Sequence, residues 1–341
     1  MGTRKLSFLI GSYADPGAPG IMEAVLDEVC GTLSVMPACC ETENPSWLHL
    51  HPNGNSLYAV EERETAGNVV RLEKGRSGWH LAQKLPVEDA PCHLSMDEQQ
   101  AFLFVSNYFS GSLCVFHLDK DGTILERTAL IRHSGHGMDP ERQEGPHVHS
   151  TLCIGDLVYT ADLGLDTVFV YRLNRSDGSL EEDGRIALES GAGPRHMVMV
   201  PGHPELLYVV CELSGDVYRL DRKACICLDR QHIIPEDEMR MVRASAVKTF
   251  RDTVYIGCRE RNAVVQFLVM SDGSLGTRTV CSHSRKTPRD VWMNEEWAIT
   301  ADQDSFGLTL FRRTGGVLSP ACFCETPGIR PSCIVPLSEK D

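Results

Sequence analysis

Leu103-Phe-Val-Ser-Asn-Tyr108 is the stretch of this sequence that decides the fold, because runs of the same kind recur along the whole chain. Each run is short, rich in β-branched and aromatic residues, and ends in a polar or small residue. That composition is typical of a buried strand leading into a turn. The further copies are Phe8-Leu-Ile-Gly-Ser-Tyr13, Leu57-Tyr-Ala-Val-Glu-Glu62, Val158-Tyr-Thr-Ala-Asp-Leu163, Leu207-Tyr-Val-Val-Cys-Glu212, Val254-Tyr-Ile-Gly-Cys-Arg259 and Ala298-Ile-Thr-Ala-Asp-Gln303. Seven copies indicate seven repeats of one structural unit.

Other strands surround each of these runs. A proline followed by a short apolar strand precedes most of them, at Pro45, Pro91, Pro146, Pro194, Pro288 and Pro331. The missing member falls at Arg243-Ala-Ser-Ala-Val247, which lacks the proline. A third strand follows each run, and Asp-Gly pairs such as Asp121-Gly122 then predict a tight hairpin into a fourth.

Four strands in each unit and a mean period of roughly 48 residues predict an all-β fold, a seven-bladed β-propeller with four-stranded antiparallel blades. We expect residues 1–341 to form this single domain, with Glu236–Arg243 as the best candidate for a short helix. The sequence starts on a second strand and ends on a first strand. We therefore predict that Pro331–Pro336 pairs with Phe8–Tyr13 and closes the ring, which removes an exposed sheet edge.

Composition limits the partners of this protein. A formal net charge of −14 disfavours a nucleic-acid or anionic membrane surface, which would need clustered Lys and Arg. The apolar stretch Leu6–Ile10 is too short for a secretory signal or a membrane span. The 14 cysteines are scattered, and most are expected to be reduced and buried. We expect a cytoplasmic protein that is a monomer or weak homodimer and binds neither nucleic acid nor a membrane.

Two rings of polar side chains are predicted around the central channel. The residues just after the recurrent proline form the first ring, namely Ser46, Cys92, His147, Arg195, Arg243 or Ala244, Arg289 and Ser332. The ends of the second strands form the other ring, namely Glu62, Asn107, Asp162, Glu212, Arg259 and Gln303. Buried His and Arg need anionic partners or water. The rings are therefore a hydrated channel, a set of structural ion pairs, or a site for an oxyanion or carboxylate.

The longest interval between repeats contains residues 132–149, which are rich in Gly, His and charge. We interpret this segment as a lid or binding loop at the channel mouth. His147 and His149 alternate on a strand and share one face, which suits either a metal or two hydrogen-bonded histidines. No third ligand is evident, so we expect no metal. The sequence also lacks Gly-x-Ser-x-Gly, Walker and Rossmann motifs, so no cofactor and no serine nucleophile of the usual hydrolase kind are expected.

Several motifs resemble those of the propeller-type lactonases, a family that includes bacterial 6-phosphogluconolactonases of propeller type and fungal carboxy-muconate cyclases. The motifs are Asn44-Pro-Ser-Trp-Leu48, Ser106-Asn-Tyr-Phe-Ser-Gly-Ser112, Arg142-Gln-Glu-Gly-Pro-His-Val-His149, Asp162-Leu-Gly-Leu-Asp166, Gly193-Pro-Arg-His196 and Cys211-Glu-Leu213. The likeness runs in order from about Gly11 to Ile334. It implies hydrolysis, or reversible closure, of a sugar or dicarboxylate lactone without a cofactor.

The resemblance also implies which residues act. By position it marks a catalytic group of His147 or His149, Arg195, Glu212 and Arg259. The predicted substrate-binding residues are Arg142, Asn107, Asp162, His196, Arg289 and Gln303. The expected reaction is hydrolysis of 6-phosphogluconolactone to 6-phosphogluconate, as in the pentose phosphate pathway. The alternatives are a carboxy-muconate-type cyclase or lyase and a non-catalytic propeller that binds a ligand.

Two segments depart from the family pattern. Cys258-Arg-Glu260 stands where the family usually shows Asn-Arg-Gly, and Arg243-Ala-Ser-Ala246 replaces a motif that normally contains an acid. Both departures bear on substrate specificity more than on the fold.

Overall fold

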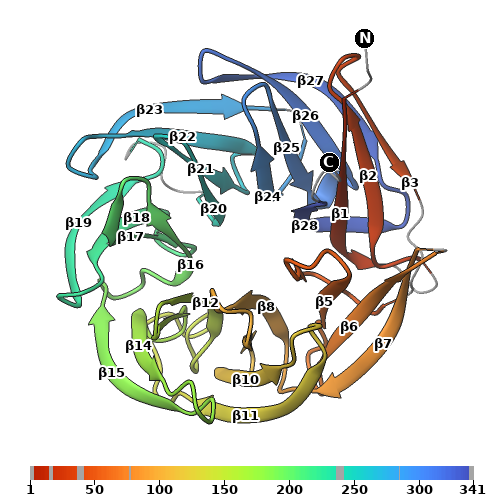
Figure 1. Ribbon diagram of the computed structural model, residues 1–341. Helices are drawn as coiled ribbons and strands as arrows, with labels where there is room; N and C mark the ends of the chain where they lie inside the picture. The colour runs from red at the N-terminus through yellow and green to blue at the C-terminus, as the bar shows by residue number, and fades with distance from the viewer. Residues whose placement is uncertain are drawn as a thin grey trace.

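Seven four-stranded antiparallel sheets surround a central channel in a computed structural model of the protein (Figure 1). The structure describes residues 4–14, 18–36, 42–76, 78–235, 242–283 and 285–337. This arrangement confirms the predicted seven-bladed β-propeller. Within the described ranges the helical structure is limited to the 3-10 helix η2 (Gln303–Ser305). The short helix predicted at residues 236–243 lies, apart from its last two positions, outside the described residues.

Each blade places its strands in the same order from the channel outward. The innermost strands are β28 (Ile329–Pro336), β4 (Leu48–Leu50), β8 (Pro91–Met96), β12 (Val148–Ile154), β16 (Pro194–Val200), β20 (Ala244–Phe250) and β24 (Pro288–Met293). The second strands are β1 (Lys5–Ala14), β5 (Ser56–Glu61), β9 (Phe102–Asn107), β13 (Leu157–Asp162), β17 (His203–Cys211), β21 (Thr253–Cys258) and β25 (Trp297–Asp302). The third strands are β2 (Met22–Asp27), β6 (Asn68–Gly75), β10 (Ser112–Leu118), β14 (Thr167–Leu173), β18 (Asp216–Asp221), β22 (Ala263–Val269) and β26 (Gly307–Thr314). The outer strands are β3 (Thr32–Met36), β7 (Gly78–Pro86), β11 (Ile124–Arg132), β15 (Leu180–Ala187), β19 (Ile226–His232), β23 (Leu275–Ser282) and β27 (Val317–Glu325).

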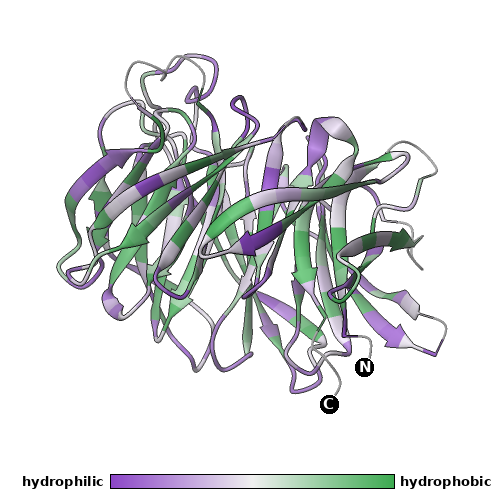
Figure 2. Cartoon of the chain, turned by 90° about the horizontal axis from the view of Figure 1, so that it is seen from above, coloured by the Kyte–Doolittle hydropathy of each residue, from purple (hydrophilic) through white to green (hydrophobic). Residues whose placement is uncertain are grey.

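The second strands carry the apolar runs because both of their faces are covered by neighbouring blades. Every residue of β5, β9 and β25 is buried, which explains continuous apolar runs in place of an apolar-polar alternation. The outer strands β11 and β15 are exposed or half-buried at all but one position each, and they carry charged residues. Figure 2 shows the same gradient, with green strands inside the blades and purple residues concentrated in the connecting loops and outer strands.

The ring closes through the two ends of the chain. Strand β28 pairs antiparallel with β1, and Ile334 lies opposite Ile10. Figure 1 shows blue β28 beside red β1. Strand β28 also contacts β24 on one side and β4 on the other, which completes the inner circle of strands. The predicted closure is therefore confirmed.

The predicted Asp-Gly hairpin turns at Gly122 and Gly273 lie within a blade and contact the preceding blade. Gly122 and Gly273 take positive φ angles of 82° and 74°, a conformation that glycine adopts without strain. The carbonyl oxygen of Gly122 accepts a hydrogen bond from the hydroxyl of Tyr58 in the preceding blade. In the same way Tyr208 donates to the carbonyl oxygen of Gly273 at 2.7 Å. These bonds satisfy buried tyrosine hydroxyls and fix the position of one blade against the next.

Two predictions from composition can be compared with this fold. The cysteines that the structure describes are free thiols, and several are buried, as expected. Among the described residues no helix has the length and hydropathy needed to cross a membrane.

Candidate active site

A β-bulge near the start of an inner strand turns one side chain toward the channel in most blades. The pairing of the inner strand with its second strand skips one residue there, and the skipped residues are Cys92, His149, Arg195, Arg289 and Ser332. Bulges often reorient a side chain beside a functional site. All five skipped residues line one cavity, so the repeated bulge builds the candidate site.

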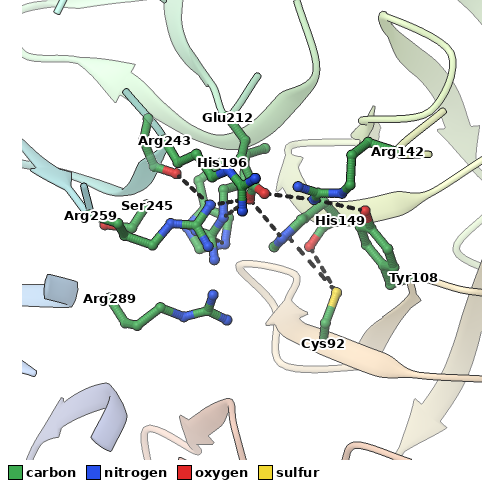
Figure 3. A network of polar contacts seen from close by, with 12 residues as sticks. Cys92, Tyr108, Arg142, His149, His196, Glu212, Arg243, Ser245, Arg259 and Arg289 are labelled. Atoms are coloured by element: carbon green, nitrogen blue, oxygen red, sulfur yellow. Dashed lines mark hydrogen bonds and ion pairs between the residues drawn. The ribbon is translucent and has the colours of Figure 1, made fainter. Parts of the chain in front are cut away.

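This cavity has a volume of about 370 Å³ and lies at the end of the channel where the second strands end (Figure 3). Every blade contributes to its wall. The lining residues are Tyr13, Ser46, Trp47, Glu62, Ala90, Cys92, Tyr108, Phe109, Arg142, His149, Arg195, Glu212, Arg243, Arg259, Arg289 and Ser332.

The first ring differs from the prediction at the fourth blade along the chain, formed by β12 to β15. Val148, not Pro146, pairs with Asp162 at the end of the second strand, so the bulged residue is His149 rather than His147. His147 is buried behind the cavity wall, where its ring stacks on Tyr108 with centroids 4.3 Å apart. Counting from the recurrent proline gave a position two residues too early in this blade.

The blade without the proline shows a smaller difference. Ala244 occupies the place of the proline because it pairs with Cys258, the last residue of β21. Ser245 then follows as the counterpart of the bulged residues, and its hydroxyl donates to the carbonyl oxygen of Pro288 at 2.6 Å. Arg243, which comes just before β20, still lines the cavity.

The second ring also differs from the prediction, because two of its members point into their own blades. The amide of Asn107 donates to the carbonyl oxygen of Ser112 at 3.3 Å, and Asp162 accepts from the backbone amide of His147 at 2.8 Å. Neither residue lines the cavity. The residue that faces the cavity after β9 is Tyr108, because side chains of a strand alternate between faces and a shift of one residue reverses them. The prediction missed Tyr108 and Phe109. Glu212 and Arg259 were predicted at the positions directly after their second strands, and the same position after β9 is Tyr108.

Glu212 is the hub of the polar network in this cavity (Figure 3). Its Oε1 atom lies 2.7 Å from Nη2 of Arg142. Its Oε2 atom lies 3.0 Å from Nε of Arg195 and 2.9 Å from Nη2 of Arg259. Burial alone would raise the pKa of the Glu212 carboxyl, but the charges of Arg259 and Arg195 outweigh it and hold this pKa well below its usual range. Glu212 is therefore ionised, and its carboxylate holds the three arginines in place.

His149 brings a neutral imidazole to the same cavity. Burial and the nearby charge of Arg195 hold the pKa of His149 well below its usual value. Its Nε2 atom is 4.0 Å from Oε2 of Glu212, beyond hydrogen-bond distance, and its Nδ1 atom is 4.0 Å from the sulfur of Cys92. A neutral imidazole nitrogen in a cavity of this kind can accept a proton from a bound water.

Arg195 on β16 and Arg289 on β24 both supply positive charge to the cavity. Burial and the like charges of Arg289 and Arg259 lower the pKa of Arg195 to about 9, so its guanidinium group still carries its charge at pH 7. Arg289 stands apart from the Glu212 network in Figure 3, and its Nη2 atom donates to the hydroxyl of Tyr13 at 3.2 Å. Within the described part of the chain, no carboxylate oxygen lies within 4.0 Å of the Arg289 guanidinium group.

A second carboxyl group, Glu62, lines the same cavity and is linked to Arg289 through the hydroxyl of Tyr13. It accepts hydrogen bonds from the hydroxyls of Tyr13, at 2.9 Å, and Ser46. Burial raises the pKa of Glu62, in contrast to that of Glu212. Two carboxyls with opposite environments are typical of sites that use acid and base groups.

The loop at residues 133–147 reaches the cavity through Arg142, whose Nη2 atom donates to Glu212 and, at 3.2 Å, to the hydroxyl of Tyr108. Gln143 anchors this loop, since its buried amide donates to the carbonyl oxygen of Leu163 at 2.9 Å and to Asp166 at 2.7 Å. The predicted binding loop therefore contributes one arginine to the wall.

Two further predicted residues lie close to the cavity without lining it. His196 is buried behind Arg195, with its ring 5.0 Å from that of Trp47 and 5.2 Å from that of His149. Gln303 lines a neighbouring cavity instead.

The charge balance of the cavity indicates what it binds. Five arginines and two carboxylates line it, although the chain as a whole has a formal charge of −14. Such an excess of guanidinium groups suits an anion or a developing oxyanion. No group of His, Cys, Asp and Glu suited to a metal ion is found among the described residues, and metal independence stays a prediction.

Comparison with known proteins agrees with this architecture. The family model described as lactonase, 7-bladed beta-propeller, matches residues 7–334. A 6-phosphogluconolactonase of Bacillus subtilis is 29% identical over 318 residues, covering 89% of this chain and 90% of the relative. A solved structure of a Lactobacillus plantarum protein has a TM-score of 0.90 at 26% identity and covers 98% of this chain and 100% of its own. The fold is also shared with a periplasmic gluconolactonase of Pseudomonas aeruginosa, with a TM-score of 0.90 at 24% identity over 99% of this chain and 100% of its own. The chain therefore belongs to the family of seven-bladed β-propeller lactonases.

Proposed function

We propose that this protein hydrolyses a sugar lactone in the cavity at the end of its channel, and that 6-phosphogluconolactone is the substrate. The observation that carries the proposal is the combination of a neutral His149 with arginines gathered around Glu212. Lactone hydrolysis needs a base for water and positive charge where the oxyanion develops. Family membership and the Bacillus subtilis relative support a lactone as substrate.

The proposed reaction has two steps. In the first, the oxygen of a water molecule bonds to the lactone carbonyl carbon while His149 takes a proton from that water. Arg195, with Arg259, stabilises the negative charge on the former carbonyl oxygen. In the second, the bond from this carbon to the ring oxygen breaks, and the ring oxygen takes the proton from His149. The product is an open sugar acid with a free hydroxyl group, and no cofactor is consumed.

Glu212 acts as a positioning residue in this scheme. Its carboxylate holds the guanidinium groups of Arg142, Arg195 and Arg259 at fixed places, so little reorganisation is needed when charge develops. Both of its oxygens are taken up by ion pairs with these arginines. The Nε2 atom of His149 lies 4.0 Å from Glu212, beyond hydrogen-bond distance, so His149 is the better candidate for the general base.

A panel of lactones tests the proposal directly. Ring opening releases a proton at neutral pH, so purified protein is mixed with 6-phosphogluconolactone, gluconolactone and a muconate-type lactone in a weakly buffered indicator solution. We expect the highest kcat/KM for 6-phosphogluconolactone. Absence of turnover on every lactone would contradict the proposal and favour a non-catalytic binding role. Action in the cytoplasm and the monomeric or weakly dimeric state stay predictions.

A pair of histidine variants tests which imidazole acts. His149→Ala is expected to lower kcat about 10²–10⁴-fold, the range for loss of a general base. His147→Gln is expected to have a much smaller effect, because His147 stacks behind the wall on Tyr108. Both variants are compared with the parent by steady-state kinetics and thermal unfolding. Equal losses for the two would contradict the assignment of His149.

The pH profile gives an independent test of the same base. His149 must be neutral to accept a proton, and its pKa lies well below 6.5. We therefore expect kcat/KM to remain constant as the pH falls from 7.5 through 6.5, and to decline only at lower pH. Circular dichroism at each pH separates this decline from unfolding. An acid limb centred near pH 6.5 would mean that an unperturbed histidine is the base.

A further inference from the structure

A second cavity adjoins the candidate active site. Its volume is about 330 Å³, and its wall consists of Tyr13, Ala14, Asn44, Arg289, Gln303 and Arg330. Tyr13 and Arg289 belong to both cavities, so these two side chains form the boundary between them. The Arg289 guanidinium group can therefore contact a molecule in either cavity.

Arg330 brings a second guanidinium group to this cavity. It lies on β28 directly opposite Tyr13 of β1, so the closing strand pair fixes its backbone. Its guanidinium group packs over the ring of Phe306 at 5.3 Å. Across the described ranges, no carboxylate oxygen lies within 4.0 Å of either Arg330 or Arg289. Arg330 is exposed, so water can solvate its charge when the cavity is empty, and an anion that enters the cavity can pair with both guanidinium groups.

The amide of Gln303 adds an acceptor. Its Nε2 atom donates to Asp304 at 3.2 Å, which assigns the other end of the amide as oxygen. That Oε1 atom is buried and has no partner among the described residues. A hydroxyl group of a bound molecule, or the proton of a singly protonated phosphate, can satisfy it.

We propose that the second cavity is the subsite for the phosphate group of the substrate, held between Arg289 and Arg330. This proposal rests on the proposed lactone hydrolysis and extends it to the far end of the sugar acid. A phosphate monoester carries a charge of about −1.5 to −2 at pH 7, which matches two guanidinium groups. Each guanidinium group can also form two parallel hydrogen bonds to phosphate oxygens. Arg289 thus separates the reacting end of the substrate from its anionic end, and Arg330 selects phosphorylated lactones.

Kinetic discrimination between two substrates tests this subsite. Arg330→Gln is expected to lower the ratio of kcat/KM for 6-phosphogluconolactone to that for gluconolactone about 10–100-fold, mainly through KM, as for loss of a charged hydrogen bond. Arg330→Lys keeps the charge and should recover part of the ratio. Arg76→Gln is the matched control: Arg76 follows β6 at the opposite end of its blade from the cavity, and this variant should leave the ratio unchanged.

Binding measurements separate failure of the subsite from failure of the proposed function. Calorimetry gives the Kd of 6-phosphogluconate, gluconate and inorganic phosphate for the parent, Arg330→Gln and Arg76→Gln. We expect Arg330→Gln to weaken 6-phosphogluconate about 10–100-fold and gluconate less than twofold. Equal affinity of the parent and Arg330→Gln for 6-phosphogluconate overturns the subsite, and so does an equal loss for both sugar acids. A parent that opens no lactone overturns the proposed function, while calorimetry still decides the subsite.

Discussion

Replacement of Arg195 by alanine is expected to lower kcat for lactone hydrolysis about 10²–10³-fold, the usual cost of removing one donor to an oxyanion. Arg195 is skipped in the pairing of β16 with β17, so its side chain projects into the cavity. The variant should remain folded, because Glu212 keeps its ion pairs with Arg142 and Arg259 at 2.7 and 2.9 Å. The carboxylate is therefore not left as an unpaired buried charge.

Arg195→Lys is expected to fail nearly as badly as the alanine variant. The Nε atom of Arg195 is occupied by Glu212, and the rest of the planar guanidinium group remains to bind an oxyanion. The ammonium group of lysine is a point charge that cannot reproduce this fork. Kinetics and thermal unfolding of both variants are compared with Arg172→Ala, which removes an exposed arginine paired with Asp183 on the outer side of a blade. If both variants fold and hydrolyse lactone at the parental rate, Arg195 is a structural residue of the channel and not part of the active site.

Deletion of the chain from Gly328 onward is expected to abolish cooperative folding. It removes β28, which buries Ile329, Cys333 and Ile334 at 0%, 2% and 5% exposure. Burial of each isoleucine contributes about 1.5–3 kcal/mol, Cys333 adds to this, and the pairing with β1 is lost as well. The total is comparable to the ~5–15 kcal/mol that stabilises a typical protein.

Thermal unfolding by circular dichroism measures the effect of this deletion. A synthetic peptide of residues 328–341, added to the truncated chain, serves as the control and should restore part of the lost structure. An unchanged Tm in the truncated protein would show that ring closure contributes little to stability.

The sequence by itself determined the architecture, because the signal for it is local and repeated. A second strand must be apolar on both faces when neighbouring blades cover it, so runs such as Leu103–Tyr108 mark every blade. The order of strands at the two ends then required β28 to complete the first blade. The arginine-rich cavity was also foreseen in part, since Arg142, Arg195, Glu212 and Arg259 were predicted site residues and all line it.

Only the tertiary structure decided which neighbouring residue faces the cavity. Side chains on a strand alternate between two faces, so an error of one residue replaces Tyr108 by Asn107, and an error of two replaces His149 by His147. A bulge inserts its extra residue without any change in local composition, and composition therefore cannot reveal it. The sequence did not predict the second cavity either. Arg289 and Arg330 both line it because the ring closes there, and no spacing along the chain indicates this.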